Sequence, residues 1–253
     1  MDKNKIDKYE LIIFDLDGTL APSKSQMEAD MAELMVRLLE KRKIAVISGG
    51  GYIQFETQFL RSWPNNYEKF SNLYLLPTSG TQLYVWKGAW CSQYIEHLTA
   101  KEKEKIMVAL NEALKMSGYV KPEIVYGSII EDRGSQITFS GVGQHAPIDV
   151  KSKWDPDRTK REKIDELLSK KIPEFDIHIG GMTSVDITKR GVNKAYGIRK
   201  LEDFLHLTAE KILFVGDALF PDGNDYPAKA TGVDCIQVAD PNETKGLITK
   251  WLE

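Results

Sequence analysis

The sequence lacks the features that mark secreted, membrane-spanning or disulfide-stabilised proteins. Only two of its 253 residues are cysteines, Cys91 and Cys235, and they lie too far apart for a CxxC zinc or redox motif. Such sparse cysteine use predicts a reducing, cytoplasmic environment. No apolar run reaches the ~18 residues that a membrane span needs, and the run that ends at Phe14 is too short for the core of a signal peptide. We therefore expect neither export nor a membrane partner.

An excess of charge of either sign is also missing. The chain carries 34 lysines and arginines against 37 aspartates and glutamates, a formal net charge of −3. We therefore expect no nucleic-acid partner, because the basic footprint that such a partner requires is absent. With 42% hydrophobic and 28% charged residues, the composition is that of an ordinary globular protein and excludes a disordered chain. The length suits one α/β domain, or such a core with an inserted cap.

Both ends of the chain alternate short apolar runs with amphipathic helical patterns. We expect strands at 11–14, 44–47, 212–215 and 235–238, and helices at 26–40, 52–62, 191–205 and 242–252. Strands separated by helices are typical of right-handed βαβ crossovers, which build a parallel sheet. The predicted fold is therefore α/β, with a doubly wound, Rossmann-like parallel-sheet core.

The middle of the chain has a different pattern. Strand-like segments at 83–86, 136–140, 176–179 and 184–187 accompany charged helical patterns at 100–116 and 157–170. Paired strands with helices on one side predict an α+β cap inserted into the core. We place the core at 1–84 and 186–253, and the cap at 85–185.

Acidic and hydroxyl side chains follow the predicted core strands. Asp15 and Asp17 follow the first strand, Ser48 follows the second, and Asp217 follows the strand at 212–215. Each alone fits the cap of a following helix. Carboxylates gathered at one edge of a parallel sheet, however, repel one another unless a cation compensates them. Mg²⁺ suits this set, because it takes one or two carboxylates together with a substrate phosphate.

These residue types are suited to phosphoryl transfer. One carboxylate of the Asp15 and Asp17 pair attacks phosphorus while the other transfers a proton. Ser48 and backbone N–H groups at a helix start are donors to phosphate oxygens. Lys194 is the candidate cation beside the phosphoryl group, although a lysine on a helix surface is the simpler explanation for that residue alone.

The segment Asp15-Leu16-Asp17-Gly18-Thr19 resembles the DxDGT nucleophile motif of the haloacid-dehalogenase-like (HAD) superfamily of phosphotransferases. Three further motifs of that superfamily follow in the same order. They are Ser48 after a strand, Lys194 in Gly191-Val192-Asn193-Lys194, and Gly216-Asp217 followed by Gly223-Asn224-Asp225. The resemblance covers the predicted core.

The resemblance implies a role for each matching residue. Asp15 is expected to be the nucleophile that forms an aspartyl-phosphate, and Asp17 the general acid and base, with its backbone carbonyl on Mg²⁺. Ser48, Gly49 and Lys194 are expected to bind phosphate. The implied metal site consists of Asp15, Asp17, Asp217 and Asp225.

A cap between the serine and lysine motifs is similar to that of the type IIB branch, which contains sugar-phosphate phosphatases and eukaryotic-type phosphomannomutases. The segments at 180–186 and 216–225 look most like the phosphomannomutases. The first of them contributes Ser184 and Asp186 as candidate substrate-binding residues of the cap. A phosphosugar is therefore the implied small-molecule partner, and the resemblance leaves open a homodimer formed through the cap.

Two positions depart from the phosphomannomutase pattern. In that family, cap arginines bind the second phosphate in a pattern like R-N-G…S-P-x-G-R. Arg133 matches its first arginine, but Gln144 stands in place of the last one. Lys24 stands where the mutases tend to carry arginine after the DxDGT loop. These departures weaken the mutase prediction and leave the core chemistry unchanged.

Three functions remain open from the sequence. The leading one is an Mg²⁺-dependent phosphatase of a small phosphate ester, expected to be a phosphosugar, that works through an aspartyl-phosphate. The alternative is a phosphomannomutase-like phosphohexomutase, in which a sugar hydroxyl rather than water attacks the phosphoenzyme. A non-enzymatic phospho-acceptor, like a bacterial receiver domain, is the least favoured, because the receiver pattern lacks an aspartate at the position of Asp17.

Overall fold

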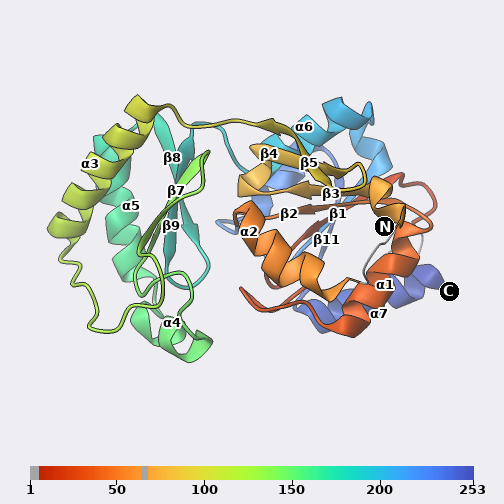
Figure 1. Ribbon diagram of the computed structural model, residues 1–253, viewed down its shortest axis with the longest axis horizontal. Helices are drawn as coiled ribbons and strands as arrows, with labels where there is room; N and C mark the ends of the chain where they lie inside the picture. Colours follow the sequence, from red (N-terminus) through yellow and green to blue (C-terminus); the bar gives the residue numbers. More distant parts are fainter. Residues whose placement is uncertain (1–5, 64–67) are drawn as a thin grey trace. The chain divides into compact units, whose positions relative to one another are not determined.

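The computed structural model describes residues 6–63 and 68–253 and divides the chain into two compact units (Figure 1). The core unit consists of Met1–Ile95 and Asn193–Glu253, and the cap unit of Glu96–Val192. The cap is thus a continuous segment inserted between two parts of the core sequence.

The core unit is built on a seven-stranded sheet with the order β11-β10-β1-β2-β3-β4-β5. Its parallel strands are β1 (Leu11–Asp15), β2 (Lys43–Ile47), β3 (Leu73–Leu76), β10 (Ile212–Gly216) and β11 (Asp234–Gln237). The antiparallel strands β4 (Gln82–Trp86) and β5 (Trp90–Ile95) extend one edge. The helices are α1 (Ala29–Leu39), α2 (Tyr52–Gln54), α6 (Lys194–Leu205) and α7 (Pro241–Leu252).

Helices cover both faces of the core sheet. On β1, Ile12 and Phe14 pack in the apolar cluster that includes residues of α1 and α7, whereas Leu11 and Ile13 pack in the cluster that includes residues of α6. A strand buried on both faces needs a continuous apolar run rather than an alternating one. That is the pattern of residues 11–14, and the predicted doubly wound α/β fold is confirmed.

The cap unit is an antiparallel sheet covered on one face by two helices. Its strands have the order β6-β7-β9-β8, with β6 (Ile130–Asp132), β7 (Gln136–Ser140), β8 (Phe175–Gly180) and β9 (Ser184–Lys189). Its helices are α3 (Ala100–Ser117), α4 (Ile148–Trp154) and α5 (Thr159–Lys171). Figure 1 shows α3 and α5 side by side along the sheet, and their apolar residues share one cluster with Ile137, Phe139, Val185 and Ile187.

Alternation along the cap strands leaves the second face polar. On β9, Val185 and Ile187 face the helices, so Ser184, Asp186 and Thr188 lie on the other face.

Helix α3 has clear end signals: Thr99 and Glu102 form a reciprocal capping box at its start, and Gly118 ends it in a left-handed conformation.

The core sheet is larger than the sequence patterns predict. The four predicted core strands correspond to β1, β2, β10 and β11, but β3, β4 and β5 were not assigned to the core. The segment at 83–86 was placed with the cap strands, yet it forms most of β4 and pairs with β3. The structural division therefore differs from the predicted boundaries at 85 and 185, because β5 pairs in the core sheet and β9 pairs wholly within the cap sheet.

The predicted helix at 52–62 is helical but not regularly wound. It begins as α2 at Tyr52–Gln54, continues as a π-helical segment at Phe55–Phe59, and ends as a 3₁₀ turn at Leu60–Ser62. A π-helical segment rotates the following side chains relative to an α-helix and is often found at functional sites. Across the described part of the chain, no helix has the length and apolar content required to span a bilayer.

Candidate active site

Three aspartates converge at the carboxyl ends of β1 and β10. β1 ends at Asp15 and pairs in parallel with β10, which Asp217 follows directly. Asp225 lies in the loop beyond, where its Oδ2 accepts a hydrogen bond from the backbone N–H of Ala218 at 2.9 Å. Carboxylate oxygens of the three aspartates all lie within 4.8 Å of one another. Parallel pairing therefore brings together the acids of two motifs that are far apart in the sequence.

Lys194 enters this cluster from the first position of α6. The helix begins at Asn193, whose side-chain oxygen accepts from the backbone N–H of Tyr196 at 3.2 Å. The Nζ of Lys194 lies 2.5 Å from Asp15 Oδ1 and also pairs with Asp225 Oδ1. The lysine is 2% exposed. It is a buried counter-ion, and the alternative of a lysine on the helix surface is wrong.

Burial in this cluster disfavours ionised carboxylates. Burial raises the pKa of Asp15 well above its ordinary value; Lys194 opposes that rise, and the neighbouring aspartates add to it. Burial also raises the pKa of Asp217, with Asp225 as a second cause. For Lys194, burial favours the neutral form, but attraction to Asp15 and Asp225 outweighs it and raises the pKa. One lysine faces three carboxylates, of which Asp15 and Asp225 are buried and Asp217 is half-buried, so acidic groups outnumber the cation.

A divalent cation fits this set of donors. Mg²⁺ prefers carboxylate oxygens and keeps part of its water shell, and a positive ion here compensates the charge that Lys194 leaves unbalanced. Asp15 uses Oδ1 for Lys194, so Oδ2 remains for a further ligand. Both oxygens of Asp225 are engaged, by Lys194 and by Ala218 N–H, which suits a supporting position. The acidic cluster is thus consistent with a metal site made mainly by Asp15 and Asp217.

Gly18 allows Asp217 to approach the DxDGT loop. A side chain at position 18 would begin 2.6 Å from Asp217 Oδ2, and the backbone there has φ +87°, in the region that favours glycine. The hydroxyl of Thr19 donates to Asp217 Oδ1 at 3.4 Å. Gly18 and Thr19 therefore help to position the carboxylate of Asp217, the candidate metal ligand.

The carboxylate of Asp17 lies apart from the three-aspartate cluster. Its Oδ1 accepts from the backbone N–H of Lys24 at 2.6 Å and from Gln58 Nε2 at 3.0 Å, and its Oδ2 accepts from Gln54 Nε2 at 2.8 Å. The side chain is thus held by three N–H donors. The metal contact expected from its backbone carbonyl stays a prediction.

Gln54 and Gln58 are not among the predicted site residues, although their spacing in the sequence is a signal for them. The two glutamines are four residues apart in the predicted helix at 52–62, so they share one helix face. That helix follows Ser48, whose strand was already placed beside the nucleophile. Two amides on one face of a helix that starts next to the candidate site could be expected to contact its acidic side chains.

Ser48 lies beside Asp15, the candidate nucleophile, at the end of the neighbouring strand. Asp15 pairs in register with Ile47, so Ser48 is one residue further along β2. Ser48 is buried, and its Oγ accepts from the backbone N–H of Gly50 at 3.0 Å, which leaves the hydroxyl hydrogen for an acceptor such as a phosphate oxygen. Gly49, the other phosphate-binding candidate of this loop, lies between them and is half-buried.

Two candidate substrate residues of the cap, Ser184 and Asp186 on β9, each contact a residue of the neighbouring strand β7. Thr138 Oγ1 donates to Asp186 Oδ1 at 2.7 Å, and the hydroxyl oxygens of Ser140 and Ser184 lie 2.8 Å apart.

Arg133 and Gln144 are also brought together. Arg133 Nη2 donates to Gln144 Oε1 at 3.3 Å, and its Nε donates to Glu131 Oε2 at 2.8 Å. The carboxylate of Glu131 was not foreseen; it lies two residues before Arg133 on β6 and partly neutralises that cation.

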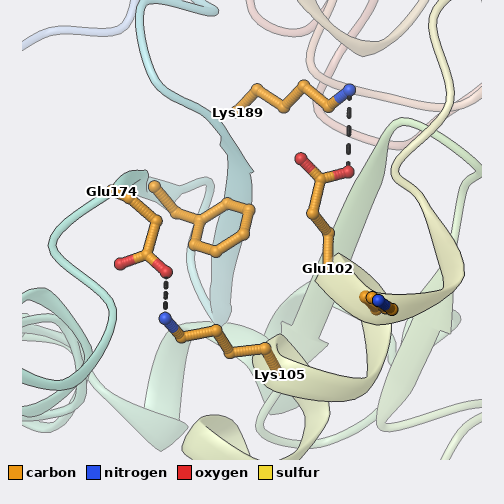
Figure 2. A pocket seen from close by; sticks show the side chains of 6 residues that line it. Glu102, Lys105, Glu174 and Lys189 are labelled. Carbon is orange, nitrogen blue, oxygen red and sulfur yellow. Dashed lines mark ion pairs between the residues drawn. The ribbon is translucent and has the colours of Figure 1, made fainter.

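A pocket elsewhere on the cap unit contains charged groups that do not converge on a ligand. It measures about 390 Å³ and is lined by residues of α3, β8 and β9. Figure 2 shows Lys105 paired with Glu174, and Lys189 paired with Glu102 at 3.6 Å. Both labelled lysines thus have a carboxylate partner within the pocket.

Comparison with known proteins relates the whole chain to one family. The sequence model of the family "eukaryotic phosphomannomutase" matches residues 31–253, a range that includes Ser48, the cap, Lys194 and Asp217 but begins after Asp15 and Asp17. A phosphomannomutase of Spinacia oleracea is 28% identical over 221 residues, which are 85% of this chain and 84% of the relative. One of Drosophila melanogaster is 26% identical over 252 residues, with coverage of 96% and 95%.

Solved structures support the fold. A haloacid dehalogenase-like hydrolase from Bacteroides thetaiotaomicron superposes with a TM-score of 0.63 at 15% identity, covering 96% of this chain and 98% of the other. The IMP-nucleotidase of Plasmodium falciparum gives a TM-score of 0.73 at 17% identity over 99% of this chain and 63% of the other. Since the family match spans core and cap alike, the chain belongs to the eukaryotic phosphomannomutase family of HAD-like enzymes.

Proposed function

We propose that this protein is a phosphohexomutase that interconverts hexose 1-phosphate and hexose 6-phosphate through an aspartyl-phosphate on Asp15. The observation that carries the proposal is the family match across both units, which includes the cap and not only the shared HAD-like core. The phosphatase that the sequence favoured shares the first half of this reaction. The two functions differ in what accepts the phosphoryl group from Asp15.

The core residues are assigned to the following steps. A carboxylate oxygen of Asp15 attacks phosphorus; the new O–P bond forms as the bond from phosphorus to the departing sugar oxygen breaks. Asp17 gives its proton to that oxygen. In the reverse transfer, a sugar hydroxyl gives its proton back to Asp17 as its oxygen takes the phosphoryl group from Asp15. A bound Mg²⁺ supplies positive charge next to the transferred phosphoryl group.

The remaining residues of the site bind and neutralise the phosphoryl group. Ser48 and the backbone at Gly49 are assigned to its oxygens, and Lys194 both orients Asp15 and offsets negative charge. In the cap unit, Arg133 is assigned to the second phosphate of the sugar, and Ser184 and Asp186 to its hydroxyls. These assignments rest on the matching motif positions.

Hydrolysis is the second candidate, and a specific observation favours it. Gln144 is neutral where the family pattern has an arginine, and Glu131 already pairs with Arg133. A weaker hold on the second phosphate lets the monophosphate leave before transfer back, after which water takes the phosphoryl group.

Phosphorus NMR of the purified protein separates the candidates. Mannose 1-phosphate, Mg²⁺ and a trace of hexose 1,6-bisphosphate are mixed with wild-type protein or with Asp15→Asn as the control. A mutase converts 1-phosphate into 6-phosphate much faster than it releases inorganic phosphate. Dominant release of phosphate establishes the second candidate instead. A single phosphorylation without turnover is the result for a non-enzymatic acceptor and contradicts both.

A further inference from the structure

Two glutamines and Asp17 close a ring of hydrogen bonds in the core unit. Gln54 Nε2 donates to Asp17 Oδ2 at 2.8 Å and to Gln58 Oε1 at 2.7 Å. Gln58 Nε2 donates to Asp17 Oδ1 at 3.0 Å and so completes the ring. We propose that Gln54 and Gln58 are positioning residues that hold the carboxyl group of Asp17 in one orientation for proton transfer. This inference rests on the proposed function, in which Asp17 moves the proton.

The ring permits one orientation for each amide. An ionised carboxylate only accepts hydrogen bonds, so both glutamines must turn their NH₂ groups towards Asp17. The carbonyl oxygen of Gln58 then faces the second hydrogen of the Gln54 amide. Rotation of either amide by 180° brings two oxygens into contact. Gln58 is 3% exposed, so bulk water does not compete for its place.

The helical segments from Tyr52 to Phe59, together with Gly50, position both glutamines. Gln54 is the last residue of α2, and Gln58 lies in the π-helical segment Phe55–Phe59. Gly50 leaves space for the Gln54 amide, because a Cβ atom at position 50 would lie 1.9 Å from Gln54 Oε1. The backbone of Gly50 is outside the left-handed region, so this glycine is needed for space rather than for its φ angle.

The hydrogen bonds distinguish the two oxygens of Asp17. Oδ1 accepts from Lys24 N–H and from Gln58, whereas among the described residues Oδ2 accepts from Gln54. Each carboxylate oxygen has about two lone pairs. Oδ1 is therefore filled, and Oδ2 keeps a lone pair for the proton that Asp17 exchanges with substrate.

A fixed Oδ2 matters most for a mutase. The bisphosphate intermediate must present first one and then the other hydroxyl position to the same acid/base. If the carboxyl group rotated between the two half-reactions, each would need its own alignment. Misplacement of a catalytic group by about 1 Å costs on the order of 10²-fold in rate.

The test compares two substrates in the phosphorylation step. Gln54→Met and Gln58→Met keep the side-chain length but remove the amide. Rapid-quench measurements with mannose 1-phosphate should show phosphorylation of Asp15 slowed by about 10- to 100-fold, with the substrate concentration at half-maximal rate unchanged. With 4-nitrophenyl phosphate the loss should stay below about 3-fold, because that leaving group needs little protonation. If the glutamines only stabilise the fold, phosphorylation by both substrates is slowed equally, and that result overturns the proposal.

Two further variants sharpen the assignment. Gly50→Ala should reproduce Gln54→Met, since the added methyl group displaces the Gln54 amide. Gln93→Met is the matched control on the edge strand β5 and should leave both rates unchanged. If Gln93→Met shows the same substrate-selective loss, the effect is not specific to the ring and the proposal is wrong.

A double-mutant comparison tests whether the glutamines act through Asp17. In an Asp17→Asn background, Gln54→Met should cause no further loss with mannose 1-phosphate, because the group that it positions is already disabled. An additional 10-fold loss overturns the proposal. Failure of the proposed function is a separate result: wild-type protein then forms no phosphoenzyme from the sugar phosphate, whatever the glutamine variants do.

Discussion

The core and cap units place their polar side chains in opposite ways. In the core, Asp15, Asp217 and Asp225 lie together at one sheet edge, and Lys194 is paired with two of them, so the acidic groups outnumber the cation. In the cap, hydroxyls and carboxylates are spread along β7 and β9 and pair with one another. The core cluster is therefore consistent with a site for a cation, whereas the polar side chains of the cap face already have partners within that face. We therefore expect substitutions in the core cluster to abolish the reaction, and single substitutions on the cap face to change which substrate is bound.

Loss of the nucleophile should have the largest effect. Asp15→Asn replaces a carboxylate by an amide, which is a far poorer nucleophile towards phosphorus. Turnover should fall below about 1% of wild type, and no acid-stable phosphate should remain on the protein after quenching. The fold should be kept, because the amide fills the same buried space and removes a charge that burial disfavours. Residual turnover of several per cent contradicts the covalent mechanism.

Removal of the cation should come next. Chelation of Mg²⁺ should abolish turnover, and Ca²⁺ should inhibit, because it takes more ligands at longer distances. Asp217→Asn should raise the Mg²⁺ concentration at half-maximal rate by more than about 10-fold. Asp203→Asn, at an exposed aspartate of α6, is the matched control and should leave that concentration unchanged. Full activity in excess chelator refutes the metal assignment.

Lys194 in the core and Arg161 in the cap are both buried cations paired with aspartate, and variants of the two should respond differently to Mg²⁺. Lys194 in the core pairs with Asp15 and Asp225, while Arg161 in the cap pairs with Asp155 at 2.7 Å and bonds the carbonyl of Gly181. Removing one partner of a buried pair costs about 3–5 kcal/mol. Lys194→Met and Arg161→Met should therefore both lower the free energy of unfolding by that amount.

Magnesium separates the two variants. In urea titrations followed by tryptophan fluorescence, Mg²⁺ should restore much of the stability of Lys194→Met, because it binds the uncompensated aspartates. It should not restore the stability of Arg161→Met, in which the carboxylate left without its cation is the buried Asp155. Equal restoration of both variants, or of neither, contradicts the idea that only the core cluster is built around a cation.

The same contrast explains which parts could be predicted from the sequence. Acids at the ends of parallel strands must meet at one sheet edge, so Asp15, Ser48 and Asp217 were placed correctly from strand order alone. Lys194 followed from its motif, but its burial depended on where α6 begins. The strand β3 was missed because periodicity alone does not distinguish a four-residue apolar run, such as Leu73–Leu76, from a segment of buried helix.

The cap residues were harder to place for a physical reason. Alternation on β9 indicates that Ser184 and Asp186 share a face, but it does not name their partners Ser140 and Thr138 across the sheet. Register decides these partners, and it is set by long-range pairing. The sequence likewise does not identify Glu131 as the counter-ion of Arg133, because that pairing depends on the conformation of the chain at the end of β6.

The smallest expected effect concerns the cap residue that departs from the family pattern. Gln144 is 7% exposed and accepts a hydrogen bond from Arg133. Gln144→Arg places a second guanidinium beside Arg133, which should lower stability slightly without ligand. It also adds a bidentate donor for phosphate, so affinity for hexose 1,6-bisphosphate in calorimetric titrations should rise by about 10-fold, or about 1.4 kcal/mol. The ratio of isomerisation to phosphate release should rise with it, because a tightly held bisphosphate returns its phosphoryl group before water reaches Asp15.

Gln144→Met is the matched control and should leave the affinity for hexose 1,6-bisphosphate within about 2-fold. If the methionine variant loses affinity while the arginine variant gains none, the neutral amide itself binds substrate, and the cap recognises the sugar in a way that its family pattern does not describe.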